Sequence, residues 1–279
     1  MVSLADNHLR ALYDSTYKQL ITQAAVYGLS PAVLDKYFRS APEYNALLGV
    51  DMSMVLERLL FTLQNRQRFS RTIRFQEHKE ETKKLLYDFD VKKIADDYKS
   101  DHAVERLHTK LCPVFKWDVN ARTPMLWCEG LIQGAQQLAK FQNSTDLVSK
   151  IRNFKGTEMV HYWMKHYPIK GMGFALTCDF LKEIGFDLAK PDVHIKGVLD
   201  SVFNLSENTL EDEEYLTLFM NIVNSLKKIK DPNLSAYKLD KMIWLVCTND
   251  FYLDRCEKNL RQNLIEKIND VLFNISTVW

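Results

Sequence analysis

Two short segments of this chain combine residue types that can do chemistry. Residues 168–173 read Pro-Ile-Lys-Gly-Met-Gly, and residues 190–195, about one helix length later, read Lys-Pro-Asp-Val-His-Ile. The chain has only nine glycines, so Gly171 and Gly173 before an apolar stretch indicate a backbone feature that side chains would obstruct. Glycine permits positive φ and close approach of another backbone. A helix that starts there leaves unpaired N–H groups that suit a phosphate.

The second segment supplies a carboxylate. Asp192 follows Pro191 at the point where the next helix should begin. A phosphate anchor followed by a carboxylate indicates nucleic acid as the ligand. Two structural alternatives stay open. Asp192 can be an ordinary helix N-cap, a role that is compatible with chemistry, and the two glycines can form a turn that serves only packing between helices.

Together the two segments resemble the helix-hairpin-helix DNA glycosylases, the superfamily that includes the 8-oxoguanine, adenine-mismatch and 3-methyladenine glycosylases. Their hairpin typically reads Leu-Pro-Gly-Val-Gly, and a Val-Asp-x-His segment after the next helix carries the catalytic aspartate. The counterparts here are residues 169–173 and 191–194, and the resemblance covers roughly residues 123–203. It implies that Asp192 is the catalytic carboxylate and His194 a structural hydrogen-bond partner. The expected partner is double-stranded DNA with a modified base flipped out of the stack.

The same resemblance assigns the hairpin to the DNA backbone. It implies that Lys170, Gly171, Met172 and Gly173 bind DNA, with the glycine N–H groups on a phosphate, a contact that positions the duplex without reading its sequence. It also allows a monovalent cation at the hairpin carbonyls. We expect no other metal and no cofactor.

One departure from the superfamily pattern bears on the reaction. Members that also cleave the strand carry a lysine two positions after the second hairpin glycine, where this chain has Ala175. The sequence therefore predicts a monofunctional enzyme that leaves an abasic site, in repair or in defence against hypermodified viral DNA. Two alternatives are a lyase that uses Lys170, Lys182 or Lys190, although we interpret the first two as surface lysines, and a non-catalytic DNA-binding protein.

Other candidate DNA contacts lie outside the two segments. Arg68, Arg71 and Arg74 would share one face if their segment is helical, and with Arg66 and Lys155 they could follow phosphates. The alternative is a solvated face balanced by nearby glutamates. Trp127, Glu129 and Gln133 are candidates for the base pocket because superfamily members place recognition residues near this helix. The alternative for Trp127 is a place in the core.

Composition excludes several classes of protein. The 279 residues are 46% hydrophobic and 26% charged, with a formal net charge of +1, and basic residues precede the hairpin while acidic residues follow the second segment. No stretch approaches the ~20 apolar residues of a membrane span, and no signal peptide opens the chain. Five scattered cysteines support neither disulfides, zinc nor an iron–sulfur cluster. We expect an intracellular monomer in the cytoplasm, nucleoid or nucleus.

Hydrophobic periodicity predicts an all-α fold. We expect helices over residues 4–27, from Ser30-Pro31, and over 54–63, 77–87, 101–111, 123–141, 145–153, 157–166, 174–184, 192–203, 212–229, 235–247 and 257–274. A short extended stretch fits residues 112–118. The resemblance implies two helical lobes with a cleft between them. The expected domains are 1–114, a helix-hairpin-helix lobe over 115–210, and 211–279 packed with the N-terminal region.

Overall fold

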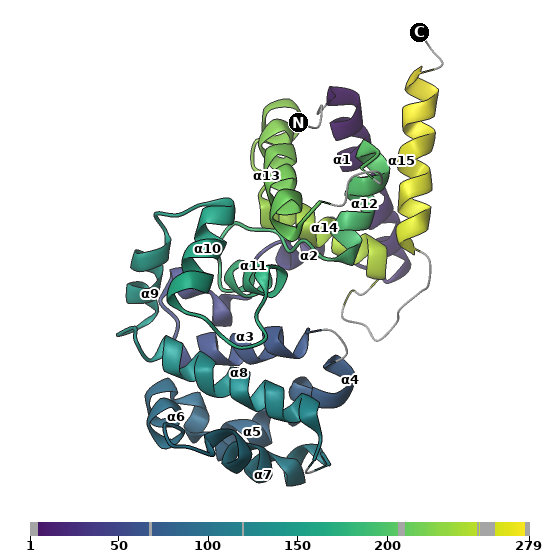
Figure 1. The fold of residues 1–279 in the computed structure, drawn as a ribbon. Coiled ribbons are helices and arrows are strands. Elements are labelled where there is room, and N and C mark those ends of the chain that lie inside the picture. The colour runs from purple at the N-terminus through teal and green to yellow at the C-terminus, as the bar shows by residue number, and fades with distance from the viewer. Residues whose placement is uncertain are drawn as a thin grey trace. The chain divides into compact units, whose positions relative to one another are not determined.

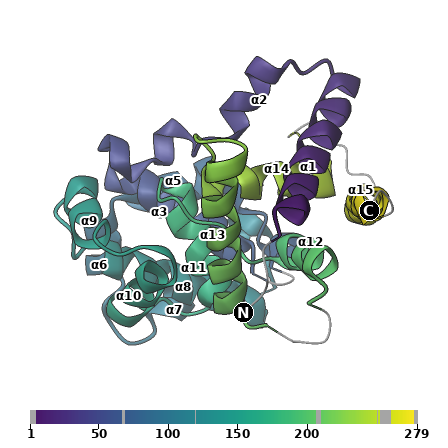
Figure 2. The same cartoon turned by 90° about the horizontal axis from the view of Figure 1, so that it is seen from above.

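The computed structural model describes residues 5–66, 69–118, 120–205, 210–249, 251 and 260–276. These residues form helices joined by turns and contain no strand, which confirms the predicted all-α fold (Figures 1 and 2). Within them, no helix is both long enough and apolar enough to cross a membrane. Four cysteines are free and buried, as expected for small apolar side chains, and Cys256 lies outside the described residues.

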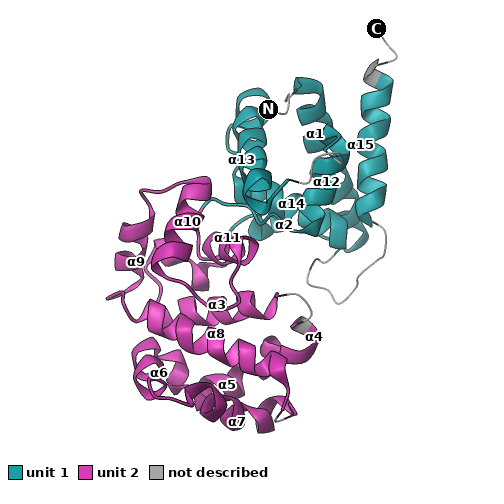
Figure 3. Ribbon diagram, in the orientation of Figure 1, with its two compact units in different colours: residues 1–39, 187–279 teal, residues 40–186 magenta. Residues whose placement is uncertain are grey.

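The chain divides into two compact units (Figure 3). Unit 1 joins residues 1–39 to residues 187–279, and unit 2 is residues 40–186. These boundaries differ from the expected ones at residues 114 and 210. The reason is packing: the helices that precede residue 115 pack on the helix that follows it, whereas the helix after Asp192 packs with the C-terminal helices.

Unit 1 contains six helices among the described residues. They are α1 (Asp6–Val26), α2 (Pro31–Tyr37), α12 (Val193–Phe203), α13 (Asp212–Ile229), α14 (Ala236–Thr248) and α15 (Leu260–Ser276). Helix α1 packs against α14 and α15, so the two ends of the chain share one core, and α12 packs against α14 and α15 as well. The predicted starts at Ser30 and Asp192 are confirmed, because both side chains cap their helices.

Unit 2 is built around α8. Its α-helices are α3 (Met52–Gln64), α4 (Ser70–Ile73), α5 (Lys79–Leu85), α6 (Val91–Asp97), α7 (Ala103–Phe115), α8 (Arg122–Leu138), α9 (Ser144–Ile151), α10 (Gly156–His166) and α11 (Phe174–Glu183). Four 3-10 turns accompany them: η1 (Pro42–Tyr44), η2 (Ala46–Leu48), η3 (Phe75–His78) and η4 (Tyr87–Phe89). Helix α8 packs against α3, α6 and α7. A Cβ at Gly134 would lie 2.4 Å from a methyl of Leu59, so this glycine lets α3 and α8 approach closely.

Three local predictions in unit 2 need correction. The stretch 112–118 is not extended, because α7 continues to Phe115 with Pro113 in its last turn. The helix expected over 77–87 is divided into η3, α5 and η4, since three consecutive residues from Tyr87 adopt positive φ. Helix α6 was not predicted, because seven residues show too little of a helical repeat.

Candidate functional site

The glycine segment is a hairpin between α10 and α11 in unit 2. Gly171 has a φ of +87°, in the region that L side chains rarely adopt, and a Cβ there would lie 2.7 Å from Nη1 of Arg66. The expected positive φ is therefore confirmed at Gly171, whereas the group that approaches it closely is the Arg66 side chain and not another backbone. Gly173 differs. Its φ of −76° suits any residue, and a Cβ there would meet no heavy atom within 4 Å.

The hairpin leaves N–H groups open at the start of α11. The N–H of Met172 donates to the carbonyl of Ile169 at 3.1 Å and closes the turn. The N–H groups of Gly171 and Gly173 have no acceptor in the part of the chain that the structure describes. The first N–H groups of a helix also lack intrahelical acceptors, and the helix dipole is positive there. This backbone can therefore bind an anion, with the Arg66 guanidinium beside it.

Helix α8 holds the hairpin from one side. Gln137 Nε2 donates to the carbonyl of Pro168 at 3.0 Å, and Gln133 Oε1 accepts from the N–H of Lys170 at 2.6 Å. About one turn before Gln133, Gly130 brings the helix so close that a Cβ would lie 3.1 Å from the carbonyl oxygen of Lys170. The path of the hairpin backbone is thus fixed by an α8 face built from a glycine and two glutamines.

The three predicted pocket residues occupy two environments. Glu129 forms an ion pair with Lys170, with 3.4 Å between Oε1 and Nζ, so Glu129 and Gln133 both contact the hairpin. Trp127 is only 1% exposed and packs against other aromatic rings of unit 2, which confirms its place in the core. A role for these residues in a base pocket stays a prediction.

The hairpin carbonyls are partly engaged. The oxygens of Pro168 and Ile169 each accept one hydrogen bond, from Gln137 and Met172, and each retains a second lone pair. A monovalent cation at these oxygens stays a prediction. Within the described ranges, no group of three or more His, Cys, Asp or Glu side chains could hold a metal ion.

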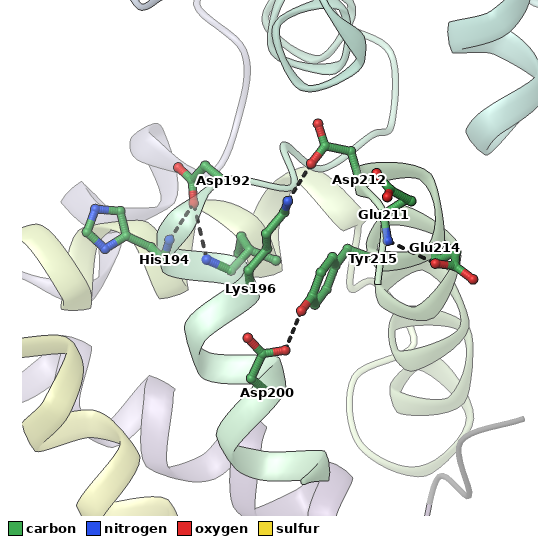
Figure 4. A network of polar contacts seen from close by, with 9 residues as sticks. Asp192, His194, Lys196, Asp200, Glu211, Asp212, Glu214 and Tyr215 are labelled. Carbon is green, nitrogen blue, oxygen red and sulfur yellow. Dashed lines mark hydrogen bonds and ion pairs between the residues drawn. The ribbon is translucent and has the colours of Figure 1, made fainter. Parts of the chain in front are cut away.

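Asp192 lies in unit 1, as the N-cap of α12 (Figure 4). Its Oδ1 accepts from the N–H of His194 at 2.9 Å and from the N–H of Ile195 at 3.1 Å. Its Oδ2 has no hydrogen-bond partner among the described residues, and the side chain is half-buried. The N-cap interpretation is therefore confirmed, and one carboxylate oxygen stays available for chemistry.

Helix α14 anchors the segment that leads to Asp192. The carboxylate of Asp187 accepts from the N–H of Tyr237 at 3.2 Å, and the carboxylate of Asp240 accepts from the N–H of Lys190 at 3.0 Å. Asp240 is 3% exposed, so this bond is shielded from water. The start of α12 is consequently held through its backbone.

Helix α12 is also tied to α13 along its length (Figure 4). The ammonium of Lys196 contacts the carboxylate of Asp212, and the hydroxyl of Tyr215 donates to Asp200. Burial and this hydrogen bond raise the pKa of Tyr215 to about 12. Lys196 follows Asp192 by about one helical turn, but its ion pair is with Asp212 and not with Asp192.

The half-buried His194 and the buried Cys247 both lie in the electrostatic field of Asp192 and of Arg261 on α15. Burial lowers the pKa of His194, the Asp192 carboxylate acts in the opposite direction, and Arg261 and Lys190 lower it further. His194 Nδ1 is buried without a hydrogen-bond partner among the described residues. Burial raises the pKa of Cys247 to about 12, with Arg261 lowering it and Asp192 raising it. His194 is therefore a neutral imidazole at neutral pH, and Cys247 a thiol.

The outlying cationic candidates are dispersed. Lys155 is exposed at the start of α10, and Arg71 is exposed on α4. Arg68 lies outside the described residues. The prediction of a shared helical face for Arg68, Arg71 and Arg74 is wrong, because α4 ends at Ile73 and Arg74 adopts a φ of +43°. Arg74 instead forms an exposed ion pair with Glu77, with 3.6 Å between Nη1 and Oε2. This agrees with the alternative, in which nearby glutamates balance these arginines at the solvent-exposed surface.

The lysines near the hairpin also differ from one another. Ala175, at the position of the superfamily's lysine, is the second residue of α11. Lys170 is exposed, as expected for a surface lysine. The same interpretation of Lys182 is wrong: it is 5% exposed, with its ammonium 3.6 Å from Asp179 and 3.7 Å from Glu183.

Three residues of the site were not predicted from the sequence. Gly130 and Gln137 support the hairpin, and Arg261 lies beside the start of α12. The two glycines of α8, four residues apart, were a signal for close packing on one helix face. Nothing near Arg261 in sequence connects it with Asp192, because the contact is made between helices far apart in the chain.

No family model matches this chain, and no curated protein matches it in sequence. Among solved structures, the chain is similar to the 8-oxoguanine glycosylase/lyase of Methanocaldococcus jannaschii in complex with a 15-mer DNA containing 8-oxoguanine. The identity is 18%, the match covers 81% of this chain and 95% of that chain, and the TM-score is 0.48. A likeness at this level assigns no activity to this chain.

The lowered pKa of His194 predicts a stability that falls in mild acid. As pH decreases through about 6.5, the unfolded chain takes up the proton before the folded one, so the free energy of unfolding decreases until the folded histidine also titrates. His108, whose pKa burial also lowers, acts in the same direction. Urea denaturation from about pH 8 to pH 5.5 should show a shallower decrease for His194→Asn than for the wild type. Equal decreases in both proteins would contradict a buried neutral His194.

Proposed function

We propose that this protein is a monofunctional DNA glycosylase. It would flip a damaged or modified nucleotide out of a duplex and hydrolyse the bond between its base and deoxyribose, in repair or in defence against hypermodified viral DNA. The observation that carries the proposal is the hairpin, which presents open N–H groups at the start of α11 and is followed in the chain by a capping aspartate with one free oxygen.

The hairpin is the proposed phosphate-binding element. Backbone N–H groups of Gly171 and Gly173, the dipole of the ten-residue α11 and the Arg66 guanidinium all favour an anion. None of them reads a base, so the hairpin fixes the position of the duplex and not its sequence. Support from α8 keeps this backbone in place before DNA binds.

Asp192 is the proposed catalytic group. When the base leaves with the electron pair of the C–N bond, positive charge develops on the sugar, and a carboxylate beside C1′ stabilises that charge. Two N–H donors hold Oδ1 in place, while Oδ2 remains free to orient the water that adds to C1′. The water loses a proton to solvent as its oxygen bonds to C1′, the departing base takes up a proton, and the products are the free base and an intact strand with an abasic site.

The assignment as monofunctional rests on the lysines. Ala175 has no amine with which to form an imine at C1′. Lys182, on the same helix, is buried and forms ion pairs with Asp179 and Glu183, so its amine is enclosed and does not reach a DNA sugar. We therefore assign water as the nucleophile, and Lys170 and Lys190 are the alternative amines that the trapping experiment below tests.

Asp192→Asn tests the negative charge of this side chain independently of its N-cap role. Asparagine caps helices as well as aspartate does, so the variant removes only the charge. We expect unchanged thermal stability and an excision rate at least ~100-fold lower in single-turnover assays, since one electrostatic contact to the transition state is removed. Asp212→Asn, at the other carboxylate close to the start of α12, is the matched control and should excise at nearly the wild-type rate. Excision by folded Asp192→Asn within a few-fold of wild type would exclude Asp192 as the catalytic group.

Gly173→Ala tests the hairpin without disturbing its fold. The φ of −76° suits alanine and the methyl meets no atom, so stability should be unchanged, while the methyl intrudes where the phosphate would bind. We expect weaker DNA binding whatever the base, measured by fluorescence anisotropy at matched salt. Gly28→Ala in unit 1 is the control with the opposite expected result. Its φ of +69° disfavours alanine, so this variant should be less stable than the wild type but should keep its DNA affinity. If Gly173→Ala bound DNA with wild-type affinity, the hairpin would be a turn that serves only packing between helices.

Borohydride trapping tests the nucleophile. Trapping requires a lysine imine at C1′, so the wild-type protein should give no covalent adduct with a DNA substrate, and strands should break only after alkali. Ala175→Lys should introduce trapping if its amine reaches the sugar in place of the water. Efficient trapping by the wild-type protein would replace the monofunctional assignment by a lyase.

A further inference from the structure

Arg261 lies against the helix that Asp192 caps. It belongs to the first turn of α15, and its Nη1 donates to the carbonyl of Val193 at 2.7 Å. Val193 is the first residue of α12 and directly follows Asp192. One hydrogen bond thus fixes the guanidinium beside the first turn of α12.

A glycine gives this guanidinium its place. A Cβ at Gly197, one turn after Val193, would lie 3.1 Å from Arg261 Nη1 and 3.2 Å from its Cδ and Cζ. Glycine inside a helix is destabilising relative to alanine. At Gly197 the missing side chain lets the arginine lie directly on the backbone of α12.

The guanidinium and the Asp192 carboxylate flank the same side chains. Both charges act on the half-buried His194 and on the buried Cys247, so Arg261 and Asp192 lie near the same two side chains. The hydrogen bond to Val193 also places Arg261 near Asp192, because Val193 directly follows Asp192 in the chain.

Arg261 retains most of its binding capacity. A guanidinium has five N–H donors, and in the described ranges only the bond to Val193 is made, with no carboxylate at ion-pair distance. The side chain is exposed. Lys196 and Lys238, on neighbouring helices, are instead paired with Asp212 and Asp231. Arg261 is therefore a fixed, exposed and unneutralised positive charge beside the candidate carboxylate.

We propose that Arg261 binds a backbone phosphate of the nucleotide on which Asp192 acts, and so positions the sugar against the carboxylate; this rests on the proposed function. A planar guanidinium matches two phosphate oxygens at once. Its fixed position reduces the conformational entropy that binding would otherwise cost. Arg261 is a binding and positioning residue, and the bond cleavage remains with Asp192 and water.

Salt dependence distinguishes a phosphate contact from a structural one. Affinity for a 15–25 base-pair duplex is measured by anisotropy over a range of KCl concentrations, for the wild type, Arg261→Met, Arg261→Lys and Arg10→Met. Loss of one phosphate contact should make the plot of log K against log salt shallower by about 0.9. We expect this for Arg261→Met, while Arg261→Lys keeps the wild-type slope because an ammonium still neutralises the phosphate.

Arg10→Met is the chemically matched control. Arg10 is exposed in unit 1, two residues after His8, whose ring stacks on Phe203 at the opposite end of α12 from Asp192. Its removal should leave the slope unchanged. Each variant is used only if its thermal unfolding matches the wild type, and Arg261→Gln replaces Arg261→Met if the latter unfolds.

The outcomes separate this inference from the proposed function. If Arg261→Met keeps the wild-type slope while the wild-type protein binds DNA and excises bases, Arg261 is a packing residue and this inference fails alone. If Arg10→Met changes the slope equally, the contact is not specific to Arg261 and the inference also fails. If the wild-type protein shows no salt-dependent DNA binding, the proposed function fails with it.

Discussion

The hairpin can present unpaired N–H groups only because another helix holds its backbone in place. Polar backbone groups without partners are costly when buried and are usually satisfied, so a chain that leaves them open must fix them at a surface. Helix α8 does this with a glycine that permits close approach and two glutamines that bond the hairpin at Pro168 and Lys170. If Gly130 carried a side chain, the hairpin carbonyl at Lys170 would be displaced, and Gln133 and Gln137 would lose their geometry.

At the start of α12, one side chain combines a structural role with the chemical role that we propose for it. Oδ1 of Asp192 caps the helix, and the same two hydrogen bonds fix the orientation of the carboxylate. Anchoring by Asp187 and Asp240 onto α14 fixes the segment that leads to it. A capped, anchored carboxylate with one free oxygen pays little reorganisation cost when charge develops nearby, which is the condition for electrostatic stabilisation of a transition state.

An arginine seated on a glycine occurs beside each part of the candidate site. In unit 2 the Arg66 guanidinium lies against Gly171, and in unit 1 the Arg261 guanidinium lies against Gly197. Many other cations are paired with carboxylates, as Lys79 is with Glu57 and Lys238 with Asp231. A formal net charge of +1 therefore gives no measure of the local field, because some cations are paired with carboxylates while Arg66 and Arg261 lie on backbone at glycines.

The sequence by itself determined what is local. Helical repeats, caps such as Ser30 and Asp192, and a rare pair of glycines identified an all-α chain, the hairpin and the capping carboxylate, because each depends on residues within one or two turns. The tertiary structure decided what depends on contacts between distant segments. It divided the chain at residues 39 and 186, buried Lys182, and placed Gln137 on the hairpin and Arg261 on α12. Such contacts depend on which helix faces pack together. The type of one residue does not indicate which distant residue it will contact in the folded chain.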